Sequence, residues 1–137
     1  MKKKIKVLHL IASLENGGAE RQLIELLKEN KNHGVVLFKN TSVYKNTLNE
    51  LNIKHWELGV KSKLLVFLKI LTVSKIIKEF QPNIVQAWMY NACFFSVVCK
   101  ILNIYRIPLI WCIRCSDMTT KYYTISLKFL IIGCKFL

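Results

Sequence analysis

A double glycine marks the most informative part of the chain, Leu14-Glu15-Asn16-Gly17-Gly18-Ala19-Glu20-Arg21, which comes directly after the apolar run Ile5–Ala12. When a buried strand leads through glycines into a helix, the first helical N–H groups are unpaired and the helix dipole favours an anion in front of them. Glycine also lets the backbone turn sharply and approach a ligand, because no Cβ is in the way. The local motif alone favours a plain tight turn, and it makes Gly17 and Gly18 candidates for a phosphate contact.

Short apolar runs alternate with longer helical patterns along the whole chain. The first run is short and almost entirely apolar, which is typical of a strand buried on both faces. Further strands are expected at Val35–Phe38, Ile53–Leu58, Asn83–Trp88 and Leu109–Ile113. Helices are expected at Gly18–Lys31, Tyr44–Leu51, Lys63–Phe80, Asn91–Asn103 and from Tyr122 onward. Repeated β-α-β units predict an α/β fold, with an open, mostly parallel, Rossmann-like sheet and helices on both faces.

Ligands in such sheets bind beyond the carboxyl ends of the strands, which here are the loops after Ala12, Trp88 and Ile113. Trp88 suits stacking on a sugar ring, as does Tyr90, although large aromatic residues also serve as core. The planar guanidinium of Arg114 suits phosphate or sugar hydroxyls, or else a structural pair with Asp117. His9 lies inside a strand and is expected to be packed rather than catalytic.

The composition narrows the class of partner. The chain has 137 residues, 53% of them hydrophobic, which predicts one domain with its own core. Its formal net charge is +13, carried mostly by lysines that are spread along the chain. Nucleic-acid readers tend to use clustered arginines, so no nucleic acid is expected. Dispersed lysines instead suit solubility or attraction to an anionic membrane surface.

The sequence predicts neither a membrane span nor a metal site. A membrane helix needs about 20 apolar residues, and the best stretch, Ala92–Ile113, is broken by Lys100, Asn103, Arg106 and Pro108. The basic start followed by Ile5–Ala12 resembles a signal peptide, but His9 interrupts its centre. Cys112 and Cys115 have half-zinc spacing without a second ligand pair. We expect a cytoplasmic protein, with a peripheral position on the inner face of the cell membrane as an option.

Three segments at successive strand ends carry a family resemblance: Gly17–Leu23, Gln81–Ala92 and Pro108–Ser116. Together they resemble the N-terminal half of family 4 retaining glycosyltransferases, which have the two-domain architecture called GT-B. The resemblance implies a nucleotide-sugar donor, no metal or other cofactor, and a glycan or lipid-linked acceptor in cell-surface polysaccharide biosynthesis.

The resemblance also implies roles for individual residues. Gly17 and Gly18 would face the donor diphosphate, and the acceptor side would be lined by Trp88, Tyr90, Asn91, Arg114 and Ser116. The chain departs from the family pattern, because many relatives have histidine at the place of Asn91, asparagine at Cys93, and histidine or asparagine at Cys115.

The resemblance further implies that residues 1–137 are a partial N-terminal, acceptor-side domain. The family holds its donor with two glutamates on a C-terminal domain that are separated by seven intervening residues, and no two glutamates here have that separation. The donor-binding domain is thus expected to be absent or on another chain, and the isolated chain to bind donor weakly and transfer no sugar. Catalytic residues are not identified. Two alternatives stay open: a non-catalytic membrane-surface module, and a nucleotide-binding α/β module of another class.

Overall fold

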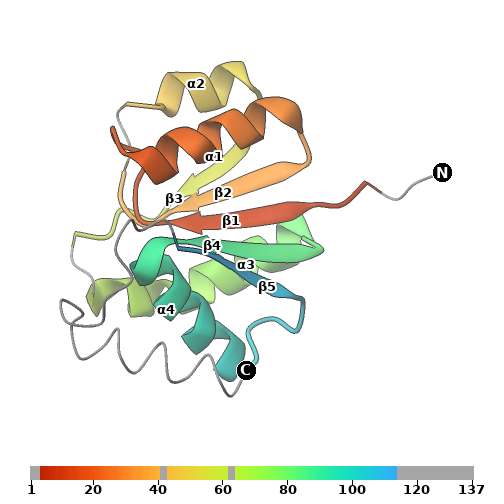
Figure 1. Ribbon diagram of the computed structural model, residues 1–137. Coiled ribbons are helices and arrows are strands. Elements are labelled where there is room, and N and C mark those ends of the chain that lie inside the picture. Colours follow the sequence, from red (N-terminus) through yellow and green to blue (C-terminus); the bar gives the residue numbers. More distant parts are fainter. Residues whose placement is uncertain (1–3, 41–42, 62–63, 114–137) are drawn as a thin grey trace.

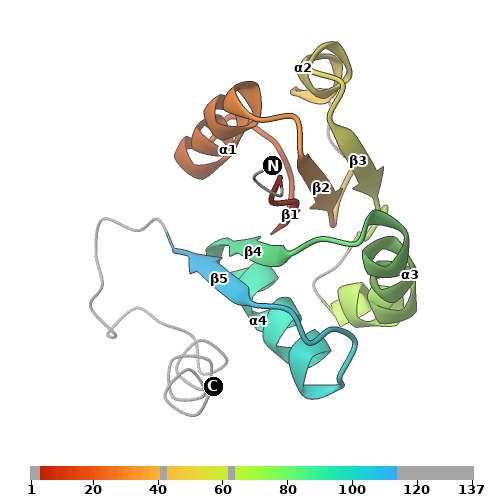
Figure 2. The same cartoon turned by 90° about the vertical axis from the view of Figure 1, so that its right-hand side faces the viewer.

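Strand β1 (Val7–Ile11) lies at the centre of a five-stranded sheet (Figures 1 and 2). The computed structural model describes residues 4–40, 43–61 and 64–113, and the predicted helix from Tyr122 lies outside them. The sheet order is β3-β2-β1-β4-β5, and its other strands are β2 (His33–Leu37), β3 (Lys54–Glu57), β4 (Ile84–Trp88) and β5 (Leu109–Cys112).

Every strand pair in this sheet is parallel. In the centre, Leu10 is in register with Val36 of β2 on one side and with Ala87 of β4 on the other. The predicted α/β fold with an open, Rossmann-like sheet is therefore confirmed.

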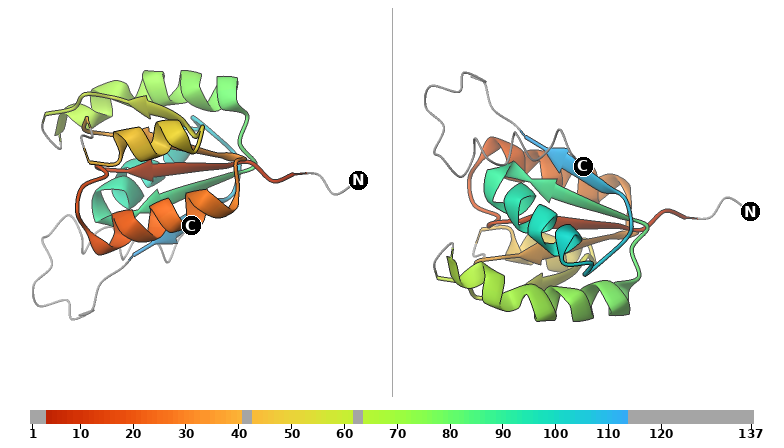
Figure 3. Two further views of the ribbon diagram at one scale, coloured as in Figure 1. Left: turned by 90° about the horizontal axis from the view of Figure 1, so that it is seen from above. Right: turned by 90° about the horizontal axis from the view of Figure 1, so that it is seen from below.

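Helices cover both faces of the sheet (Figures 1 and 3). Helices α1 (Gly18–Glu29) and α2 (Lys45–Glu50) lie on one face. The 3₁₀ helix η1 (Leu64–Lys69), α3 (Ile70–Phe80) and α4 (Met89–Ile101) lie on the other. Because strand side chains alternate between faces, Leu8 and Leu10 of β1 join the α3–α4 layer, while Ile11 joins the α1–α2 layer.

Helix α1 buries one apolar stripe against the sheet, made of Ala19, Leu23, Ile24 and Leu27. The spacing of the apolar residues in α1 would also place Leu26 in this stripe, but Leu26 is 37% exposed. The buried face is centred between Leu23 and Leu27, so Ile24 turns inward and Leu26 lies at the border.

The predicted single helix 63–80 is divided in the structure. It begins as the 3₁₀ helix η1 and continues as α3. The side chains that pack into the core include Val66, Phe67, Ile70, Val73, Ile76 and Ile77. Their intervals of three fit both 3₁₀ and α geometry, so they do not account for the tighter first turns.

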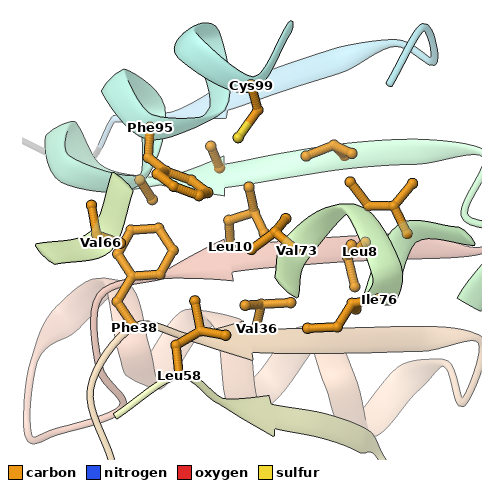
Figure 4. Packing of buried hydrophobic residues seen from close by; sticks show 14 of the residues in the cluster. Leu8, Leu10, Val36, Phe38, Leu58, Val66, Val73, Ile76, Phe95 and Cys99 are labelled. Atoms are coloured by element: carbon orange, nitrogen blue, oxygen red, sulfur yellow. The ribbon is translucent and has the colours of Figure 1, made fainter. Parts of the chain in front are cut away.

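Aromatic packing joins the sheet to the α3–α4 layer. Figure 4 shows Phe38, just after β2, facing Phe95 of α4, and their rings meet edge to face at 5.0 Å between centroids. Phe67 of η1 also contacts Phe95, at 6.0 Å between centroids. These contacts fix η1 and α4 against the segment that follows β2 at the carboxyl end of the sheet, which is where the candidate site lies.

Candidate functional site

The strand order reverses between β1 and β4. From β1 the chain steps outward through β2 to β3, and then crosses back to β4 and continues to β5 on the opposite side. In open α/β sheets, ligands bind beyond the carboxyl ends of the strands at this switch point. Both helices that follow these two central strands, α1 and α4, begin at that edge (Figure 3).

The two glycines at the start of α1 are not equivalent. A Cβ built on Gly17 would collide with the carboxylate of Glu20, whereas a Cβ built on Gly18 would have no neighbour within 4 Å. Gly17 has extended backbone with φ −126°, and the one glycine with positive φ in the described ranges is Gly59. The turn expected at the double glycine is therefore not made by left-handed backbone. Gly17 leaves space for Glu20, and Gly18 leaves an open surface.

The peptide groups of this turn are partly used within the protein. The Gly17 N–H donates to the Glu15 carbonyl at 2.9 Å, and the Arg21 N–H donates to the Gly17 carbonyl at 3.0 Å. The amides predicted to be unpaired are thus the N–H groups in the first turn of α1, because a helix contains no carbonyl that can accept from its first N–H groups. The carboxylate of Glu20 lies beside this turn, in the place where the helix dipole favours a negative charge.

The start of α4 combines a buried ring with an unusual backbone. Trp88 ends β4 and is 2% exposed, so its ring packs with the α1–α2 layer and presents no face on which a sugar could stack. The next residue, Met89, has φ of 63°, the left-handed region that non-glycine residues rarely adopt. Such backbone strain clusters at functional sites. Tyr90 is half-buried and Asn91 is exposed, both in the first turn of α4.

A chain of hydrogen bonds runs from Trp88 across the centre of the sheet. The Trp88 indole N–H donates to His9 Nδ1 at 3.1 Å, and His9 Nε2 lies 2.6 Å from His33 Nδ1. An indole N–H can only donate, so Nδ1 of His9 is an acceptor and its proton is on Nε2. His9 therefore donates to His33, whose own proton is on Nε2. The prediction that His9 is a packed histidine is confirmed, since it is fully buried.

Burial keeps both imidazoles neutral. Desolvation, with a smaller repulsion from His33, lowers the pKa of His9 to about 3. Desolvation also lowers the pKa of His33. These histidines hold Trp88 in place and are too enclosed for proton exchange with a ligand.

The structure brings part of the predicted site together. Gly17, Gly18, Tyr90 and Asn91 lie at the carboxyl edge, at the starts of α1 and α4. Arg114 and Ser116 lie outside the described residues, as does Cys115. Within residues 4–40, 43–61 and 64–113, no three His, Cys, Asp or Glu side chains gather in a way that could hold a metal ion.

Sequence reasoning missed two features of this edge. The left-handed Met89 had no signal, because methionine has no preference for that conformation. The pairing of His9 with His33 joins residues 24 apart in the chain, which no local pattern indicates.

Known structures share this fold. HepE of Anabaena in complex with UDP and glucose matches with a TM-score of 0.72 at 21% identity, over 95% of this chain and 35% of that protein. A glycosyltransferase from Rickettsia africae matches with a TM-score of 0.62 at 21% identity, over 91% of this chain and 35% of that one. UDP-GlcNAc 2-epimerase from Neisseria meningitidis, bound to UDP-GlcNAc, matches with a TM-score of 0.53 at 14% identity, over 78% and 31%.

At such identities these likenesses show the fold, which is part of the GT-B architecture. The chain spans about a third of the length of the proteins it matches. No protein-family model matches the sequence, and no curated protein does.

Proposed function

We propose that the chain is the acceptor-side part of a family 4 GT-B glycosyltransferase that uses a nucleotide-sugar donor. One observation carries this proposal: α1 and α4 both begin at the switch point between β1 and β4, and α1 does so with an open glycine, Gly18. The likeness to a glycosyltransferase and to proteins solved with UDP or UDP-GlcNAc supports the same reading.

In this proposal the donor diphosphate lies in front of Gly17 and Gly18. The first-turn amides of α1 donate to its oxygens, and the helix dipole adds a favourable field. The missing Cβ at Gly18 lets the phosphate approach the backbone closely. Because nothing in the protein requires a glycine there, a close-lying ligand gives a physical reason for it.

The acceptor lies on the α4 side of the same edge. Tyr90 and Asn91 lie in the first turn of α4, and their proposed role is to contact the acceptor. The same role is proposed for Arg114 and Ser116, which lie outside the described residues. Trp88 contributes through its backbone, because its buried ring anchors the strained turn into α4. The acceptor is a glycan or lipid-linked sugar of cell-surface polysaccharide synthesis, handled in the cytoplasm at the inner membrane face.

The donor nucleotide and sugar are held mainly by a second domain, from the same or another polypeptide. Residues 1–137 alone therefore bind nucleotide sugar weakly and transfer no sugar. A nucleotide-sugar-binding module without transferase activity is the second candidate, because the epimerase shares this fold.

Backbone amide NMR of the 137-residue chain, titrated with UDP-glucose, tests the proposed site. We expect shift changes at residues 17–19 and 89–91, and weaker binding for the Gly18→Ala variant. That substitution has room in the folded protein and suits a helix, so it should preserve or slightly raise stability. Loss of binding without loss of stability would separate a ligand contact from a folding role.

Two results would overturn the proposal. One is shift changes that lie away from the carboxyl edge. The other is binding that Gly18→Ala leaves unchanged. Sugar transfer by residues 1–137 alone would contradict the need for a second domain. Adding a complementing C-terminal domain distinguishes the two candidates, because only a transferase would then transfer sugar.

A further inference from the structure

Three exposed leucines form a stripe on the outer face of the η1–α3 segment. In a 3₁₀ helix, side chains three residues apart lie above one another. Leu65 and Leu68 of η1 follow this interval, and Leu71 comes three residues later, in the first turn of α3. The three residues are 45%, 76% and 72% exposed. We call these three residues the leucine stripe. The residues that alternate with them, Phe67 and Ile70, pack into the core instead.

Lysines continue the same line along α3. Lys75 and Lys78 follow Leu71 by four and seven residues, which places all three on one side of the helix. Both lysines are exposed. The neighbouring acid, Glu79, has its charge matched by Lys54, with 2.5 Å between Nζ and Oε1. The face is therefore apolar at its first turns and basic beyond them.

The leucine stripe belongs to a segment that packs against the core and starts at the same end of the sheet as the candidate site. Phe67 packs edge to face on Phe94 of α4, at 5.7 Å between ring centroids, so the core fixes the segment that bears the stripe. The η1–α3 segment starts at the carboxyl edge, the same end of the sheet where α1 and α4 begin (Figure 3).

We propose that the leucine stripe and Lys75 and Lys78 form a docking surface for an anionic lipid bilayer. The leucines enter the boundary between headgroups and acyl chains, and the ammonium groups contact anionic headgroups. A second copy of the chain is a poorer occupant, because each copy carries a formal net charge of +13 and two basic surfaces repel each other. The surface is independent of the proposed sugar transfer, and its binding is measured without any nucleotide sugar.

Co-sedimentation of the 137-residue chain with vesicles tests this surface. We expect binding to phosphatidylcholine–phosphatidylglycerol vesicles, much weaker binding to pure phosphatidylcholine, and weakening at high salt. Leu68→Ser with Leu71→Ser should reduce binding about tenfold or more, since each leucine loses apolar burial. Lys75→Gln and Lys78→Gln should each reduce it about fivefold.

Matched controls make the result specific. Ile101→Ser with Leu102→Ser removes two apolar side chains at the C-terminal end of α4, where the residues are 65% and 56% exposed. This double variant should not change binding. Lys28→Gln with Lys31→Gln removes two charges on the α1 side and should weaken binding less than the α3 pair. Thermal unfolding of each variant verifies that it folds.

Three outcomes would overturn the proposal. The first is equal binding to neutral and anionic vesicles. The second is equal loss in the stripe and control variants. The third is self-association without lipid that the Leu68→Ser/Leu71→Ser variant abolishes, since this would make the stripe an interface between copies.

Discussion

At the scale of single residues, Trp88 determines the state of two histidines. Its indole N–H fixes the tautomer of His9, and His9 in turn fixes that of His33. Both rings are held neutral by burial, which lowers their pKa values. A protonated imidazole at either position would be a charge without a counterion in the core of the sheet. This row of side chains, Trp88, His9 and His33, thus stabilises the fold only while neither histidine carries a positive charge.

The histidine row predicts a loss of stability in acid. The folded pKa values are lowered, so below about pH 6.5 the unfolded chain binds protons that the folded chain does not. The stabilising contribution is complete above that pH, and for His9 it falls by about 1.4 kcal/mol per pH unit until the pH approaches its folded pKa of about 3. His33 adds a fall in the same direction. Urea unfolding at about pH 7 and about pH 4.5 should differ by roughly 3 kcal/mol.

A variant identifies the source of this acid sensitivity. His9→Gln keeps a donor and an acceptor but does not titrate, so the pH slope should decrease by up to about one proton. An unchanged slope would show that other groups cause the acid effect.

Glu20 is predicted to compete with anions at the start of α1. Its carboxylate lies beside Gly17, where the helix dipole favours negative charge. Glu20→Gln should lower the free energy of unfolding by about 0.3–1 kcal/mol and strengthen the binding of pyrophosphate. Glu29→Gln, at the other end of α1, should have the opposite sign on stability and no effect on binding. Denaturant unfolding and amide NMR measure both quantities, and equal binding by the two variants would refute the competition.

At the scale of elements, the starts and ends of helices carry the unusual backbone. Gln81 ends α3 in the left-handed conformation with φ of 50°, and its N–H donates to the Ile77 carbonyl at 2.9 Å. Glycine is the usual residue at this position because it has no Cβ penalty. Met89 at the start of α4 shares the conformation but also packs in the core, so only Gln81 can be replaced without losing contacts.

Gln81→Gly is therefore predicted to stabilise the protein. The relief of left-handed strain exceeds the greater entropy of glycine in the unfolded chain, and the net gain should be about 0.5–1 kcal/mol. Lys78→Gly in the interior of α3 should instead cost about 1 kcal/mol. Chemical denaturation compares the two, and a loss of stability in both variants would show that Gln81 is not strained.

At the scale of the whole molecule, one sheet joins the two helical layers. Leu10 of β1 is fully buried in the α3–α4 layer, and Leu23 of α1 in the α1–α2 layer. Since β1 contributes side chains to both layers, we expect them to unfold together.

Leu10→Ala and Leu23→Ala should each lower the free energy of unfolding by about 2–5 kcal/mol, because each leaves a cavity in a closed core. Leu26→Ala, with a side chain that is 37% exposed, should change it by about 0.5 kcal/mol or less. Urea unfolding should shift in midpoint without a change of slope. If either core variant changed the slope or showed two transitions, the layers would be separate folding units.

The overall topology was predictable because apolar runs and helical patterns alternate strictly, and β-α-β units permit few arrangements. The positions of Gly17, Tyr90 and Asn91 at one edge follow from that topology. The burial of Trp88 does not, because a large aromatic residue at a strand end can either stack on a ligand or pack in the core. The division of residues 64–80 was also hidden, because intervals of three fit both 3₁₀ and α geometry.

The central place of β1 has a consequence for synthesis on the ribosome. This strand is made first, and its pairing with β2 is complete once Leu37 has emerged. Its other edge is completed only by β4, which ends at Trp88, roughly fifty residues later. At about 5–20 residues per second, an apolar strand edge waits for roughly 3–10 s. We therefore expect nascent chains stalled in this interval to be the form that chaperones hold most tightly.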